Sequence, residues 1–73
     1  MINANKLRGK IVENGLTVEA VAEQMGMDRS TLYRKMRPDT GTSFTVGEAR
    51  AIGRILKLSA QDVMAIFFSD YVA

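Results

Sequence analysis

Gly26 separates two short amphipathic segments in the first half of the chain, and this break constrains the fold more than any other feature of the sequence. Glycine adopts the left-handed backbone conformation at a helix end without steric cost. Thr17 is a favourable N-cap at the other end of the preceding segment. The apolar residues between them are spaced as one stripe on a helix: Val18, Val21, Ala22 and Met25. The sequence therefore predicts a helix over residues 18–25 that ends in a turn at Gly26.

A second helix is predicted to follow the turn, from about Arg29 to Met36, with Asp28 as its N-cap. Leu32 and Met36 lie one turn apart on it and form a narrow apolar seam. The other side is polar and basic over an arc of about 140°, and it carries Arg29, Ser30, Tyr33, Arg34 and Arg37. Arginine pairs with guanine edges in the major groove, and serine donates to or accepts from base edges. These residues are therefore candidates for contacts with DNA.

The residue pattern alone leaves two interpretations of this helix open. A charged helix face is usually only solvated, and helix pairs joined by a glycine also occur in proteins that do not bind DNA. Arg29, however, stands in the first turn, where the helix dipole disfavours a cation. A local rule broken at one position favours a functional role, unless Asp28 beside it simply neutralises the charge.

Residues 17–32 resemble the Cro-type, lambda repressor-like helix-turn-helix family of phage and bacterial transcriptional regulators. The residues that carry the resemblance are Thr17, Glu19, Val21, Ala22, Met25, Gly26, Met27, Arg29, Ser30, Thr31 and Leu32. The family pattern asks for a small residue at Ala22, a glycine at Gly26 and an aliphatic residue at Leu32, and all three are present. The likeness extends more loosely to about residue 67.

The resemblance implies an all-α, compact five-helix domain over residues 1–73, with the helix-turn-helix at its second and third helices. It also implies a double-stranded DNA operator as partner, with the third helix in the major groove. The base-contacting residues would then be Arg29, Ser30, Tyr33 and Arg34. We expect phosphate contacts from Thr17, Thr31, Lys35 and Arg37.

Two positions depart from the family pattern. Val18 stands where the family usually has a polar residue that grips phosphate and braces the recognition helix. Lys35, Met36 and Arg37 lead into a longer loop where the family often has a short Glu–Arg–Gly turn. The family's brace at Val18 and the contacts of its Glu–Arg–Gly turn are therefore not transferred to this chain, and the phosphate contacts expected of Lys35 and Arg37 rest on the positive charge of that segment.

Composition restricts the function classes further. The 73 residues include no cysteine and no histidine, so a disulfide framework, a thiolate metal site and histidine acid–base chemistry are excluded. We find no nucleophile–base pair and expect no enzyme activity, cofactor, metal or small-molecule substrate. No apolar run reaches the roughly 20 residues of a membrane span, and the default expectation is a cytoplasmic protein without membrane contact. The basic charge is concentrated in the first half of the chain. Residues 1–37 carry seven basic and four acidic side chains, whereas residues 38–73 carry three basic and four acidic ones.

The rest of the chain is predicted to form three supporting helices. The first is expected over about residues 4–14, with Leu7 and Ile11 buried. A loop over residues 37–43 leads to Phe44, which closes onto the core. Thr45 and Glu48 form a capping box for a helix over about 46–56, whose inward residues would be Val46, Ala49, Ile52, Ile55 and Leu56. The last helix starts near Ala60, is capped by Ser59 and packs Val63, Ile66 and Phe67.

The aromatic tail is a candidate surface for self-association. Phe68, Tyr71 and Val72 either cover the edge of the first helix or form a homodimer contact, since exposed apolar patches often mark partners. The outward face of the helix over residues 45–56 is the alternative dimer surface. A two-fold dimer would bind an inverted-repeat operator. Two functions stay open: a DNA-binding regulator, and a protein-binding module of the same fold that modulates a repressor without binding DNA.

Overall fold

The computed structural model describes residues 2–37 and 43–71, with only the backbone of Tyr71. Regular structure in these ranges is entirely helical, without a strand. The elements are α1 (Ala4–Glu13), α2 (Val18–Met25), α3 (Arg29–Met36), α4 (Val46–Ile55), α5 (Ala60–Phe67) and the short 3-10 helix η1 (Ser69–Tyr71). The predicted all-α fold with five helices is confirmed for the part of the chain described.

Side-chain caps start four of the five helices. Thr17, Thr45 and Ser59 each accept a hydrogen bond from the backbone N–H three residues later, as predicted. Asn3 caps α1 in the same way. The capping box of α4 is complete, because the Glu48 carboxylate also accepts from the Thr45 N–H at 2.9 Å.

Asp28 differs from the prediction, although it does occupy the N-cap position of α3. Its side chain makes no capping hydrogen bond to the helix backbone. The carboxylate instead accepts a hydrogen bond from the Ser30 hydroxyl at 3.1 Å. The first turn of α3 therefore begins without a side-chain cap.

The turn between α2 and α3 is made as the sequence predicts. Gly26 has φ 68° and ψ 28°, the left-handed conformation, which is unfavourable for residues that carry a Cβ. Its N–H donates to the Glu23 carbonyl at 3.1 Å, and the Met27 N–H donates to the Ala22 carbonyl at 2.9 Å. A Cβ built at Gly26 would meet no atom within 4 Å. The need for glycine here therefore comes from backbone conformation and not from crowding.

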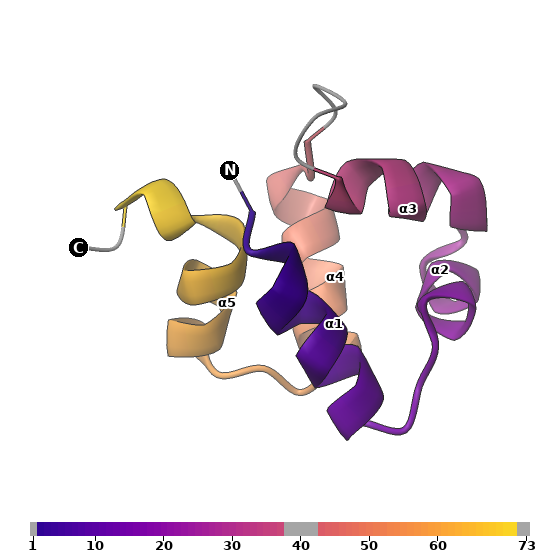
Figure 1. Ribbon diagram of the computed structural model, residues 1–73, viewed down its shortest axis with the longest axis horizontal. Coiled ribbons are helices and arrows are strands. Elements are labelled where there is room, and N and C mark those ends of the chain that lie inside the picture. The colour runs from indigo at the N-terminus through magenta and orange to yellow at the C-terminus, as the bar shows by residue number, and fades with distance from the viewer. Residues whose placement is uncertain (1, 38–42, 72–73) are drawn as a thin grey trace.

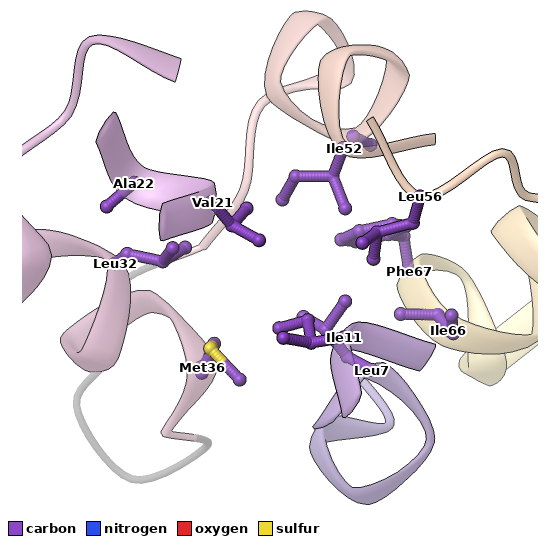
Figure 2. Close-up of a cluster of buried hydrophobic side chains, with 11 residues drawn as sticks. Leu7, Ile11, Val21, Ala22, Leu32, Met36, Ile52, Leu56, Ile66 and Phe67 are labelled. Carbon is purple, nitrogen blue, oxygen red and sulfur yellow. The ribbon is translucent and has the colours of Figure 1, made fainter. Parts of the chain in front are cut away.

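All five helices contribute to one core. α2 packs against α1, α3 and α4, while α5 packs against α1 and α4 on the other side (Figure 1). Figure 2 shows the buried side chains converging from these helices. The core comprises Leu7, Ile11, Val21, Ala22, Leu32, Met36, Ala49, Ile52, Leu56, Ile66 and Phe67. Phe44 closes the α3–α4 connection onto it, with its ring edge-to-face against Phe67 at a centroid distance of 5.2 Å.

Three details correct or limit the predicted elements. Val46 was expected inward but is 65% exposed. At about 100° per residue it lies about 90° from the centre of the stripe made by Ala49, Ile52 and Leu56, at the edge of the buried side. Ile55, on the other flank of that stripe, is only half-buried. The predicted loop over 37–43 lies mostly outside the described residues, because positions 38–42 are not described.

The end of α1 is tied to the end of α4. Asn14 follows α1, and its side-chain amide donates to the carbonyl of Lys10 at 2.8 Å and to the carbonyl of Leu56 at 3.2 Å. None of the helices in the described ranges has the length and apolar character needed to span a bilayer.

Candidate nucleic-acid interface

α3 has one buried side and one exposed side. Leu32 and Met36 are each 1% exposed and anchor the helix in the core. The exposed side carries the polar and basic residues predicted from the sequence, and α3 lies along the top edge of the molecule in Figure 1. We call this surface the α3 face and define it by Thr17, Arg29, Ser30, Tyr33, Arg34 and Arg37, all of which are exposed. The other two predicted contacts, Thr31 and Lys35, are half-buried.

A hydrogen bond between α2 and α3 crosses this face. The Tyr33 hydroxyl donates to Glu19 Oε2 at 2.9 Å, across a sequence separation of 14 residues. The pKa of the Glu19 carboxyl is lowered, first by a hydrogen bond from its own backbone N–H and then by the Tyr33 hydroxyl. The pKa of Tyr33 is raised, chiefly because its hydroxyl proton is held by the Glu19 carboxylate.

The same carboxylate also interacts with two other residues of the α3 face. The positive charge of Arg29 and a hydrogen bond from the Thr17 hydroxyl make smaller contributions to the lowered pKa of Glu19. Thr17 Oγ1 meanwhile caps α2 by accepting from the Ala20 N–H at 3.1 Å. The structure therefore brings the start of α2 together with the first two turns of α3 around Glu19.

Lys35 points toward α4 and not onto the α3 face. Its side chain is only 14% exposed, and its Nζ lies 3.2 Å from Glu48 Oε1. The ammonium also donates to the Ser43 carbonyl at 2.9 Å. Burial opposes ionisation of Glu48, but the Thr45 N–H and the Lys35 ammonium outweigh it and lower the pKa of that carboxyl. The predicted phosphate contact is thus already engaged in linking α3 to α4.

Two of the three cations on α1 are paired with α5. Lys6 and Lys10 lie 3.5 and 3.3 Å from the Asp62 carboxylate. The Lys10 ammonium lowers the pKa of Asp62, and Asp62 raises the pKa of Lys10. Arg8 is different: it is exposed, and its charge acts on the Tyr33 hydroxyl, lowering the pKa of that group against the larger effect of Glu19. Arg8 is therefore an exposed cation of α1 whose charge acts on Tyr33.

An open hollow of about 480 Å³ lies between the end of α2 and the start of α4. Met25, Met27 and Ala51 give it an apolar wall, and Glu48 is its ionisable group. That carboxylate is already bonded to Thr45 and paired with Lys35. The described residues contain no cluster of three or more His, Cys, Asp or Glu side chains placed to hold a metal ion.

The predicted self-association surface is only partly visible. Phe68 follows α5, is half-buried and packs against the core. The side chain of Tyr71 and all of Val72 lie outside the described residues. Met64 on α5 is 43% exposed. The dimer contact stays a prediction.

The sequence did not predict two partners that come from other helices: Glu19, which is bonded to Tyr33 on the α3 face, and Glu48, which pairs with Lys35 away from that face. Glu19 and Tyr33 belong to different helices, so no periodicity within one segment relates them. Glu48 has a sufficient local role in the capping box, which hid its pairing with Lys35. Comparison of the chain with known protein families, curated proteins and solved structures found no match.

Proposed function

We propose that the chain is a sequence-specific, double-stranded DNA-binding transcriptional regulator of the lambda repressor-like helix-turn-helix kind, with α3 as its recognition helix in the major groove. The observation that carries this proposal is the division of α3 into two sides. Leu32 and Met36 hold the helix in the core, while the other side presents Arg29, Ser30 and Arg34 to solvent. A helix fixed on one side and arginine-rich on the other has the chemistry needed to read base edges.

The α2–turn–α3 arrangement supports the same proposal. Two short packed helices joined through a glycine turn are the form of a helix-turn-helix, in which the second helix enters the groove. α3 begins at Arg29, so Arg29 and Ser30 stand in its first turn, where the motif makes its base contacts. Tyr33 lies at the edge of this set, where its ring is suited to pack on a thymine methyl group.

We assign the phosphate contacts to hydroxyl and cationic side chains on and around the α3 face. Arg37 and Thr17 are exposed on the α3 face, and Arg8 adds a cation from α1. Thr31 keeps the phosphate role given to it by the sequence. Lys35 is assigned to the α3–α4 link, because its ammonium is paired with Glu48.

We propose further that DNA is bound by two copies of the chain. A module of this size buries little DNA surface and discriminates poorly alone. Two copies bound to one face of the duplex would read two half-sites of an inverted repeat, with centres about one turn of B-DNA, ~34 Å, apart. The tail beginning at Phe68 remains the proposed contact between them.

The experiment is selection of bound duplexes from a random pool, followed by measurement of affinity for the selected site against salt concentration. Phosphate contacts predict that log K falls linearly and steeply with log salt, since each neutralised phosphate contributes about −0.9 to the slope. The selected sites should contain an inverted repeat. A chain that retains no duplex at any salt concentration contradicts DNA binding and favours the protein-binding module.

A further inference from the structure

Glu19 places a negative charge beside the residues that are proposed to bind DNA, which is itself a polyanion. Its exposed carboxylate lies beside the Tyr33 hydroxyl and close enough to Arg29 for their charges to interact. A negative charge there opposes the approach of phosphate groups of any sequence. The helix dipole favours an acid in the first turn of α2, but that interaction does not require the bond to Tyr33.

Fold stability is a weak reason for the Glu19–Tyr33 bond. Both side chains are exposed, and exposed polar pairs contribute little to stability. α3 is already fixed by Leu32 and Met36, which are almost completely buried. What the bond does fix is the direction of the Tyr33 side chain, whose hydroxyl is anchored to the neighbouring helix.

We propose that Glu19 is a positioning and specificity-determining residue, which holds Tyr33 in one orientation on the α3 face and weakens binding to DNA that offers only phosphates. The inference rests on the proposed function. Tyr33 must break this bond to turn outward to a phosphate, so it contributes most where the groove fits its anchored position. The carboxylate charge lowers affinity for every duplex, whereas base contacts restore affinity at the correct site alone.

Two changes at Glu19 separate positioning from charge. Glu19→Gln removes the charge and keeps an oxygen that can accept from Tyr33. Glu19→Ala removes both, and Tyr33→Phe removes only the donor. Glu23→Ala is the matched control, because it deletes an exposed carboxylate one turn further along α2. Far-UV circular dichroism and thermal melts establish that each variant is folded.

The measurement is the ratio of affinities for the selected site and for a scrambled duplex of equal length. Glu19→Ala and Tyr33→Phe should each lower this ratio about three- to tenfold. The double variant should lower it no further, because both changes break one bond. Glu19→Gln should raise both affinities about two- to fivefold at low salt and leave the ratio within about twofold of the parent. Glu23→Ala should leave the ratio unchanged.

A second readout needs no DNA. Ionisation of Tyr33, followed by NMR of its ring, should occur at lower pH in Glu19→Ala than in the parent, and Glu23→Ala should not move it. An unchanged affinity ratio in Glu19→Ala, or additive losses in the double variant, would overturn the inference while leaving DNA binding intact. A parent chain that binds no DNA would overturn both proposals, whatever the tyrosine titration shows.

Discussion

Two glycine-to-alanine substitutions should change stability in opposite directions. Gly26→Ala places a Cβ on a residue with φ 68°, and Gly9→Ala places one within the helical stretch of α1. Neither added Cβ would meet an atom within 4 Å. The two substitutions therefore differ in backbone conformation alone, which makes each a control for the other.

The expected magnitudes follow from that difference. A left-handed conformation costs a residue with a Cβ about 1–2 kcal/mol, and reduced freedom of the unfolded chain returns about 0.4–1 kcal/mol. Gly26→Ala should thus lower the free energy of unfolding by about 1 kcal/mol, or about 4–8 °C in Tm for a domain of this size. Gly9→Ala should raise it by about 0.5–1 kcal/mol, because alanine is the better helix former.

Urea and thermal unfolding of the parent and both variants, with unchanged m-values, would measure these differences. Gly26→Asn should lose less than Gly26→Ala, since asparagine tolerates the left-handed region, and Gly26→Val should lose more. A Gly26→Ala chain as stable as the parent would refute the reasoning, because it would mean that the α2–α3 turn does not need a left-handed residue.

Three further predictions concern the recognition helix, the α3–α4 link and pH. Arg29→Ala should weaken binding to the selected site by about 1–3 kcal/mol and relax the preference at one base position. Arg50→Ala, on the exposed side of α4, should do neither. Equal losses of affinity for the two variants in a mobility-shift assay would contradict the docking of α3. Lys35→Met should lower stability by about 1 kcal/mol and leave the salt slope of DNA binding unchanged; a reduced slope would restore Lys35 as a phosphate contact. The carboxyls of Glu19, Glu48 and Asp62 have lowered pKa values in the folded chain. Their contribution to the free energy of unfolding is therefore present above their ordinary pKa values of 3.8–4.5 and is lost on further acidification. Lys10 and Tyr33 have raised pKa values, so their contribution to the free energy of unfolding is lost as pH rises above about 10. Urea midpoints should therefore be constant between about pH 6 and about pH 9. A change of the midpoint with pH inside this range would contradict the assignment.

Local sequence signals predicted the parts of the fold that local chemistry determines. Thr17, Thr45 and Ser59 cap their helices because a hydroxyl near the first turn satisfies a backbone N–H regardless of the rest of the molecule. Gly26 ends α2 for a similarly local reason. Val46 was placed wrongly because hydrophobicity alone does not tell which apolar residue at a helix start lies on the buried stripe.

The candidate surface was predictable only where one helix determines it. The exposed side of α3 follows from helical periodicity, since Leu32 and Met36 fix which side is buried. The partners of Tyr33 and Lys35 do not, because Glu19 and Glu48 come from other helices and their distances depend on how α2, α3 and α4 pack. Those two contacts underlie two of our proposals: that Glu19 positions Tyr33, and that Lys35 links α3 to α4 and makes no phosphate contact.

The most direct measurement of the central proposal is an amide chemical-shift titration of the labelled chain with the selected duplex. DNA binding through α3 predicts that the largest changes fall on residues 29–37, on the start of α2 around Thr17 and Glu19, and near Arg8. The exposed side of α4 around Arg50 and Arg54 should change little. Changes concentrated on α4 or α5 would contradict α3 as the recognition helix, and no changes at saturating duplex would contradict DNA binding itself.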